Sequence, residues 1–120
     1  MIAVGCDLSR VERFERLMEK EHFLRRVFTE GELAFLAGKT QAAQSAAGLW
    51  AAKEACAKAL GTGFRGFGPI DIEIGHDGLG KPIALLHRGA GERMRALGGT
   101  KMEVSIAHDG GVALGVAVLE

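Results

Sequence analysis

Apolar residues alternate with polar or small ones near both ends of the chain. In residues 2–8, Ile2, Val4 and Cys6 share one side, which is the period of a half-buried strand. The second half predicts four more strands, at 70–74, 83–86, 101–107 and 112–119. Turn-forming residues at 76–82 lie between the first two of these strands, and those at 108–111 lie between the last two. We therefore expect two strand–turn–strand units.

Helical spacing dominates the first half of the chain. Ser9 and Glu12 have the spacing of a capping box, which predicts that a helix begins there. Thr29 and Glu32 repeat this spacing ahead of a second, shorter helix. The Ala-rich stretch 42–60 predicts the longest helix, because alanine has the highest helix propensity.

The order of these elements indicates a fold class. Helices gather in the first half and strands in the second, with a further short helix expected at 91–97. This arrangement favours an α+β fold with helices packed on a mainly antiparallel β-sheet. A chain of 120 residues is long enough for one core, so we expect a single domain over 1–120.

Charge and hydropathy exclude several classes of function. Lys and Arg number 15, as do Asp and Glu, so no net charge favours nucleic acid as a partner. No apolar run reaches the roughly 18 residues of a membrane span and no leader pattern is present, so we expect a cytoplasmic protein. Cys6 and Cys56 lack metal-binding spacing, and we expect both to be small buried hydrophobes.

The densest group of candidate chemical residues lies in the segment from Trp50 to Lys58. On a helix, Glu54 and Lys58 lie one turn apart on the same face, which suits either a surface salt bridge or a reactive site. Asp7 ends an apolar strand, where it can cap the next helix or bind a cation. Asp7 and Glu54 together would suit Mg²⁺, which takes one or two protein carboxylates and completes its shell with water and phosphate oxygens.

Two turns carry further candidates. His108 closes a strand at a Gly-rich hairpin, where an imidazole can be structural or can contact a phosphate. The Gly78–Pro82 turn can offer backbone N–H groups to an anion, although a Gly/Pro turn between strands explains it equally well. It lacks the spacing of a P-loop.

Several segments together resemble one family. They are Gly5-Cys6-Asp7-Leu8, Phe28-Thr29-Glu30, Trp50 to Gly63, Gly80-Lys81-Pro82, and Val104 to Asp109. In this order they resemble the holo-[acyl-carrier-protein] synthases, the small single-domain 4'-phosphopantetheinyl transferases. The resemblance implies Mg²⁺-dependent transfer of 4'-phosphopantetheine from coenzyme A to a serine of apo-acyl carrier protein. That reaction releases adenosine 3',5'-bisphosphate and supports fatty acid biosynthesis.

The resemblance also implies roles for individual residues. Asp7 and Glu54 match the family's magnesium carboxylates, Lys58 matches a lysine that stabilises phosphate, and Glu54 is the preferred candidate for the general base. The coenzyme A site would include Lys58 and, at its nucleotide end, Gly80, Lys81, Pro82 and His108. The surface that docks the carrier protein would include Arg13, Met18, Lys20, Phe23 and Arg26. The family forms homotrimers with active sites between subunits, so the apolar positions of the sheet could form an interface.

Two positions depart from the family's pattern. Leu49 stands where relatives commonly have a basic residue, which puts one phosphate contact in doubt unless Lys39 or Lys53 replaces it. His22 stands where the docking surface often has arginine.

The residues alone leave two other functions open. One is an interaction module in which Asp7 and Glu54 are structural, and the other is a different Mg²⁺-dependent nucleotide hydrolase or transferase. Stabilisation by Mg²⁺ and coenzyme A would separate the first from an enzyme. Dependence on a carrier protein would separate the second from the synthase.

Overall fold

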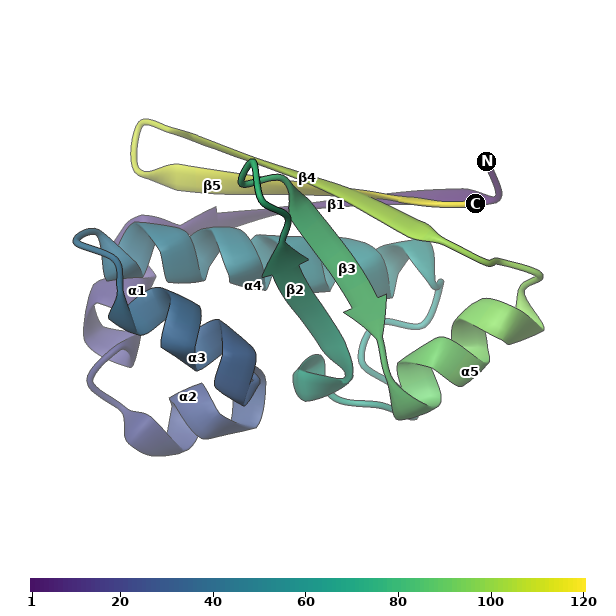
Figure 1. Ribbon diagram of the computed structural model, residues 1–120, viewed down its shortest axis with the longest axis horizontal. Coiled ribbons are helices and arrows are strands. Elements are labelled where there is room, and N and C mark those ends of the chain that lie inside the picture. Colours follow the sequence, from purple (N-terminus) through teal and green to yellow (C-terminus); the bar gives the residue numbers. More distant parts are fainter.

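The computed structural model describes all residues, 1–120, as two antiparallel sheets arranged around one long helix (Figure 1). The larger sheet has the order β1-β5-β4, and the smaller one is the hairpin β2-β3. Ala3 pairs with Leu119, so the two ends of the chain lie side by side. The strand bounds are β1 (Ala3–Arg10), β2 (Ile72–His76), β3 (Pro82–Leu86), β4 (Met102–Asp109) and β5 (Val112–Leu119).

The long helix α4 (Ala42–Ala59) lies across one face of the three-stranded sheet, with the shorter helices grouped at its two ends (Figure 1). This arrangement confirms the expected α+β fold, with helices packed on antiparallel sheets. No helix combines the length and apolar character needed to cross a bilayer. The remaining helices are α1 (Val11–Leu17), α2 (Glu21–Val27), α3 (Glu30–Ala37), α5 (Arg88–Ala96) and the 3₁₀ turn η1 (Pro69–Asp71).

Helix α4 approaches the sheet so closely that glycine is required beneath it. A Cβ atom on Gly115 of β5 would overlap the backbone of Ala51, and one on Gly5 of β1 would overlap the carbonyl oxygen of Ala55. The helix presents a row of buried alanines to the strands, so the contact is nearly backbone to backbone. Close packing of this kind leaves no free space for a larger side chain.

Because of this close approach, the face of β1 toward α4 has small residues and the face away from it has the large apolar ones. Its buried positions are Gly5 and Ser9, whereas Val4 and Leu8 point away from α4 and are 58% and 68% exposed. The prediction that Cys6 is buried is therefore wrong, because it lies on the outward face with these residues. Cys56 is buried as expected, and burial raises the pKa of its thiol to about 12.

One predicted capping box is confirmed and the other is wrong. The Thr29 hydroxyl accepts from the backbone N–H of Glu32 at 3.2 Å, and the Glu32 carboxylate accepts from the N–H of Thr29 at 2.8 Å. Ser9 instead belongs to β1, where it pairs with Ala113, and its hydroxyl is buried without a partner. Sheet pairing therefore extends past Ser9, and α1 begins after Arg10 without a side-chain cap.

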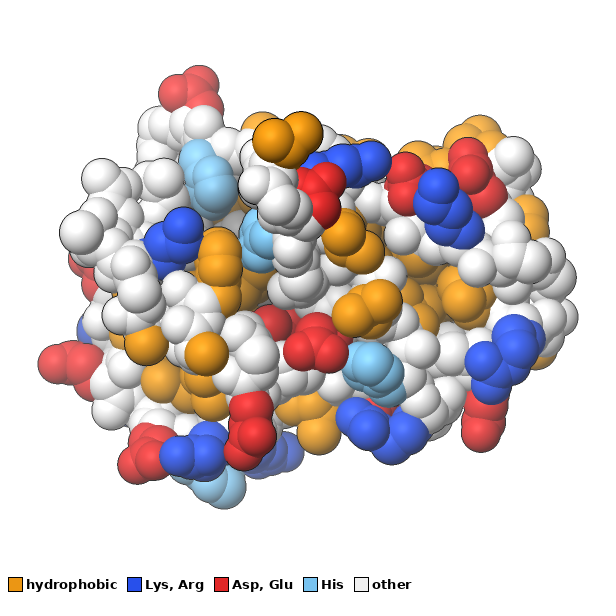
Figure 2. Space-filling model, in the orientation of Figure 1, with side chains coloured by type: hydrophobic (Ala, Val, Ile, Leu, Met, Phe, Trp, Pro, Cys, Tyr) orange, Lys and Arg blue, Asp and Glu red, His pale blue; other side chains and the backbone are white.

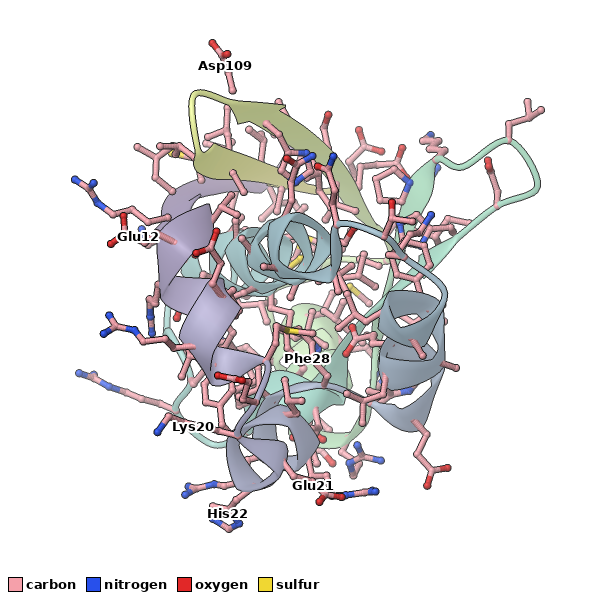
Figure 3. All side chains as sticks on the ribbon, turned by 90° about the vertical axis from the view of Figure 1, so that its left-hand side faces the viewer. Glu12, Lys20, Glu21, His22, Phe28 and Asp109 are labelled. Carbon is pink, nitrogen blue, oxygen red and sulfur yellow. The ribbon has the colours of Figure 1, made fainter.

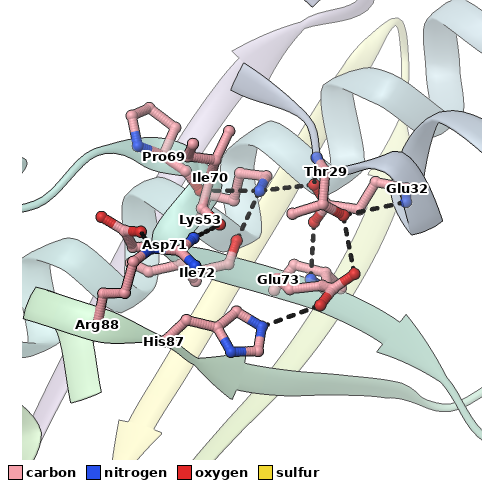
Figure 4. A network of polar contacts seen from close by, with 11 residues as sticks. Thr29, Glu32, Lys53, Pro69, Ile70, Asp71, Ile72, Glu73, His87 and Arg88 are labelled. Atoms are coloured by element: carbon pink, nitrogen blue, oxygen red, sulfur yellow. Dashed lines mark hydrogen bonds and ion pairs between the residues drawn. The ribbon is translucent and has the colours of Figure 1, made fainter. Parts of the chain in front are cut away.

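A buried ion pair joins α3 to α4 (Figure 4). The Lys53 ammonium lies 2.7 Å from Glu32 and also donates to the carbonyl oxygens of Pro69 at 2.9 Å and Ile72 at 2.6 Å. The second carboxylate oxygen of Glu32 accepts from the N–H of Ile74 at 2.7 Å. Burial lowers the pKa of Lys53, and the Glu32 carboxylate opposes that shift. The network holds η1 and β2 against α4.

Glu32→Ala removes the only carboxylate that pairs with Lys53 and leaves an ammonium buried without its counter-ion. We expect the free energy of unfolding to fall by about 3–5 kcal/mol, measured by urea denaturation at neutral pH. The matched control is Glu30→Ala, because Glu30 is exposed in the same helical turn, and it should cost less than about 1 kcal/mol. Equal losses in the two variants would contradict the role given to the buried pair.

Candidate active site

Asp7, Glu54 and Lys58 come together where β1 meets α4. The Lys58 ammonium lies 3.0 Å from the Asp7 carboxylate and donates to the carbonyl oxygen of Cys6 at 3.1 Å. Lys58 therefore pairs with Asp7 rather than with Glu54 one turn away, and Asp7 does not cap α1. Asp7 is 19% exposed and Lys58 52% exposed, so the pair lies at a surface open to solvent.

The two carboxylates influence each other electrostatically. Burial and then the negative charge of Asp7 raise the pKa of Glu54, while Lys58 and Arg13 oppose that rise. The hydrogen bond to Asp7, followed by the charge of Asp7, raises the pKa of Lys58, so its ammonium stays charged at neutral pH. The two carboxylates thus lie in a charged cluster with Lys58 and, on α1, Arg13.

This pair fits a hard divalent cation. No third carboxylate, histidine or cysteine joins Asp7 and Glu54 in a cluster that could enclose a metal ion. Two part-buried carboxylates suit Mg²⁺, which retains water or takes substrate oxygens at its other positions. A cation between them would also relieve the repulsion that raises the pKa of Glu54.

A pocket of about 200 Å³ lies between α3, α4 and the β2–β3 hairpin. Figure 2 shows histidine, basic and hydrophobic side chains gathered on this face. The His108 ring lies against α4, with its Nε2 3.0 Å from the carbonyl oxygen of Gln44. A Cβ on Gly48 would lie 2.8 Å from that Nε2, so glycine makes room for the ring. The lining residues are Phe35, Ser45, Gly48, Leu49, His76, Gly80, Pro82, Ile106 and His108.

The carboxylate pair and the pocket lie on opposite flanks of α4. Asp7 is on β1 and His108 on β4, which are the two edges of the three-stranded sheet. Glu54 and Ser45 are separated on α4 by about 180° of rotation, at 100° per residue. Within one chain, the long helix thus separates the two regions.

Comparison with known proteins decides the family. A family model described as the 4'-phosphopantetheinyl transferase superfamily matches residues 3–112. The chain belongs to this superfamily. The holo-[acyl-carrier-protein] synthase of Clostridium novyi (strain NT) is 40% identical over 121 residues, covering 100% of this chain and 88% of that protein. The synthase of Caldanaerobacter subterraneus subsp. tengcongensis is 44% identical over 119 residues, covering 98% of this chain and 93% of that protein.

Solved structures of synthases share the whole fold. The crystal structure of the synthase from Neisseria meningitidis superposes with a TM-score of 0.90 at 31% identity, covering 100% of this chain and 98% of that one. The Helicobacter pylori synthase, solved in complex with coenzyme A, gives a TM-score of 0.84 at 31% identity, covering 98% and 99% of the two chains.

Not every expected residue of this superfamily member reaches its expected place. Gly80, Pro82 and His108 do line one pocket, but the Lys81 ammonium lies 3.6 Å from Glu103 instead. Lys53 cannot act on a phosphate in place of a basic residue at position 49, because its ammonium is fully buried on Glu32.

Among the pocket-lining residues that sequence reasoning missed are two with aromatic rings. Phe35 lies on α3 and His76 at the end of β2, and their rings stack at 4.2 Å between centroids. The position of His76 directly before the Gly-rich turn was the one sequence signal that it could line the pocket. Nothing in the spacing showed that α3 packs beside that turn.

The residues expected to dock a carrier protein lie on α1 and α2. Lys20, Phe23 and Arg26 line a hollow of about 580 Å³. Figure 3 shows Lys20 and His22 beside α2. Arg13 is close enough to oppose the rise in the pKa of Glu54, which connects α1 with the carboxylates. Phe23 packs edge to face on Phe14, with ring centroids 6.2 Å apart, so only part of its ring is available to a partner. Met18 is half-buried at the end of α1.

Asp7→Asn in this superfamily member should lower the pKa of Glu54. The substitution removes the negative charge that raises this pKa and frees the Lys58 ammonium, which lowers it further. The pH titration of the Glu54 side-chain carboxyl, followed by carbon-detected NMR, measures the shift. Glu12→Gln is the control, because Glu12 is exposed on α1 and should leave the titration unchanged. An unchanged or higher pKa in Asp7→Asn would show that the carboxylates are not coupled.

Proposed function

We propose that this chain transfers the 4'-phosphopantetheine group of coenzyme A to a serine hydroxyl of apo-acyl carrier protein. The serine oxygen forms a bond to the phosphorus that carries pantetheine, and the bond from that phosphorus to the bridging oxygen breaks. The products are holo-acyl carrier protein and adenosine 3',5'-bisphosphate. The observation that carries this proposal is the Asp7, Glu54 and Lys58 cluster in a chain that aligns over its full length with the synthases.

Each residue of the cluster has a distinct task in this reaction. Glu54 accepts the serine proton as the general base, because it lies beside the carboxylate of Asp7 and the ammonium of Lys58 at the reacting end of the site. Lys58 places a permanent positive charge beside the phosphates. Asp7 positions Lys58 and, together with Glu54, would hold Mg²⁺. When bound there, Mg²⁺ supplies the charge that orients the pyrophosphate and neutralises the leaving bisphosphate.

The pocket beside His108 takes the nucleotide end of coenzyme A. Gly80 and Pro82 give it a wall with little side-chain bulk, while Leu49 and Ile106 offer apolar contact to a base. Lys81 stands at the rim of this wall with its ammonium directed to Glu103. Lys81 can leave Glu103 and bind a phosphate instead, because an exposed ion pair contributes little to stability.

The α1–α2 surface suits an acidic carrier protein. Arg13, Lys20 and Arg26 are exposed, and none of them forms an ion pair with a carboxylate of this chain. Unpaired cations can speed the encounter with an acidic partner and set its orientation. The position of Arg13 close to Glu54 would bring the acceptor serine of a docked carrier to the carboxylates.

The separation of the carboxylate pair from the pocket, which we call the two half-sites, favours an active site shared between copies of the chain, and the resemblance to the synthases implies that three copies assemble. Coenzyme A must reach both the carboxylates and the pocket, and α4 separates them within one chain. The outward face of the sheet exposes Val4, Cys6 and Leu8, an apolar surface that another copy can cover. In such a trimer, Asp7 and Glu54 of one subunit face the nucleotide pocket of its neighbour. Each subunit is one transferase domain, 1–120, acting in the cytoplasm in support of fatty acid biosynthesis.

Intact-mass spectrometry of apo-acyl carrier protein tests the reaction. Incubation with this protein, coenzyme A and Mg²⁺ should add about 340 Da, and a chelator should abolish the gain because phosphoryl transfer needs the metal. Glu54→Ala should give no product and remain folded, since alanine is a good helix former. Glu92→Ala, an exposed change on α5, should match the unmodified protein. No mass gain from a folded sample would favour a binding module without catalysis.

Mixed oligomers test whether active sites form between subunits. The protein should have three times its subunit mass of 12.7 kDa. Glu54→Ala removes a carboxylate and His108→Glu places a negative charge in the pocket, so each variant alone should be inactive. Trimers co-assembled from equal amounts should regain roughly a quarter of the activity. In about that fraction of the sites, a subunit with an intact Glu54 faces a neighbour with an intact His108. Sites built within one chain would regain none.

A further inference from the structure

Arg88, the first residue of α5, has a backbone conformation that strains a residue with a side chain. Its φ is 47°, and it is the only residue other than glycine with a positive φ. Strand β3 ends at Leu86, so only His87 lies between the strand and the helix. A Cβ on Gly89 would overlap the carbonyl oxygen of Gly66, so the start of α5 packs tightly on the loop that leads to η1. This packing fixes the turn that strains Arg88.

The Arg88 side chain ends at the carboxylate of Asp71 in η1 (Figure 4). Its Nε donates to one carboxylate oxygen at 2.5 Å. The other oxygen accepts from the backbone N–H of Gly68 at 3.0 Å, which closes the 3₁₀ turn. Burial raises the pKa of Asp71, but the hydrogen bonds from Gly68 and Arg88 outweigh it and lower this pKa, so the carboxylate is charged at neutral pH. Arg88 is thus the counter-ion of the group that shapes η1.

The η1 turn is held from two sides. On the inner side, the Lys53 ammonium of α4 donates to the carbonyl oxygen of Pro69 at 2.9 Å. On the outer side, the backbone N–H of His87 donates to the carbonyl oxygen of Asp71 at 2.7 Å, and Arg88 binds the Asp71 side chain. Lys53 is fully buried, whereas the Arg88 side chain is 65% exposed. Arg88 is therefore the solvent-facing end of the contacts that fix this turn.

Pro69 connects η1 with the hollow of about 580 Å³ beside α2, which we call the docking hollow. Six of its seven lining residues lie in the segment 20–27, and Pro69 is the seventh. Helix α2 packs against η1, so Pro69 is the one part of the lining that another element supplies. The width of the docking hollow thus depends on how firmly η1 is held beside α2. An apolar ring there adds to the surface that Phe23 and Val27 offer to a partner.

We propose that Arg88 is a positioning residue for the carrier protein, because its pair with Asp71 fixes η1 so that Pro69 gives the docking hollow its width. This inference rests on the proposed function, in which an acidic carrier protein docks on α1 and α2. Arg88 acts through Asp71 and Pro69 and does not itself contact the carrier. Glycine at position 88 would relieve the backbone strain but could not reach Asp71.

Steady-state kinetics with apo-acyl carrier protein tests the proposal. Arg88→Gly and Arg88→Ala both remove the contact with Asp71, so each should raise the KM for the carrier about threefold, as expected for one exposed ion pair. The kcat and the KM for coenzyme A should not change. Arg88→Gly also relieves the strain, so its thermal midpoint should lie above that of Arg88→Ala.

Equal increases in KM from two variants of different stability would show that docking depends on the contact rather than on overall stability. Arg95→Ala is the control, because it removes an exposed arginine of α5 that forms no ion pair, and its KM should match that of the unmodified protein. An unchanged KM in both Arg88 variants, or increases that follow the loss of thermal stability, would overturn the proposal.

A further variant shows whether Arg88 acts through Asp71 or binds the carrier directly. Asp71→Asn keeps an acceptor for the N–H of Gly68 but removes the charge that holds Arg88. It should raise the KM for the carrier as much as Arg88→Ala does. The double variant should have the same KM as either single one, because the two residues form one contact. If Arg88 bound the carrier directly, Asp71→Asn would free it, and a KM that falls or stays the same would contradict the proposal.

Binding without reaction separates this proposal from the proposed function. Calorimetry with apo-acyl carrier protein and no coenzyme A should show weaker binding in Arg88→Ala. In a Pro69→Ala background, Arg88→Ala should have no additional effect, because the side chain that it positions is already gone. If this dependence is found but no phosphopantetheine is transferred, the docking hollow stands and the proposed reaction fails. If transfer proceeds and the affinity for the carrier does not depend on Arg88, only the further inference fails.

Discussion

The close contact between α4 and the three-stranded sheet is the constraint on which the rest of the molecule depends. Gly5 and Gly115 allow the helix backbone to lie directly on β1 and β5, and no side chain can separate them. Because Asp7 follows Gly5 by two residues on the same face of β1, this contact brings it to Lys58 on the helix. On the other edge of the sheet, Gly48 lets the His108 ring rest on α4. One packing interface thus positions both the carboxylate pair and the pocket.

An interface of glycine and alanine contributes little hydrophobic stabilisation, because it buries few large side chains. The large buried residues lie elsewhere, with Phe14 and Phe28 on the helical side and Leu49 and Ile72 between α4 and the smaller hairpin. Lys53 lies within this second layer, and its pair with Glu32 joins elements that apolar contacts alone would hold less specifically. The larger side chains of β1 and β5 are displaced to the outward face, which is where an apolar surface between copies becomes possible.

Local signals predicted most elements, but they missed α2 and began β2 two residues early, at Ile70, which lies in the 3₁₀ turn. Tertiary contacts account for further errors. The capping box at Thr29 formed because nothing competes for its backbone, whereas Ser9 was drawn into sheet pairing with Ala113. Alternation in β1 identified a strand, but only the proximity of α4 decides that Cys6 faces outward. Periodicity also could not show that Lys53 points into the core. The resemblance to the synthases supplied the carboxylates and the pocket turn, while the contribution of α3 to the pocket emerged only from the fold.

The absence of a buried cation from the pocket beside His108 follows from the same packing. Position 49 is only 1% exposed, so a cation there would have to lose its hydration before any phosphate arrived. Leucine avoids that penalty and completes the apolar wall. The exposed ammonium of Lys39 lies outside that wall, 4.6 Å from the centroid of the Phe35 ring, and stays hydrated. The lining of the pocket therefore contains no lysine, arginine or carboxylate.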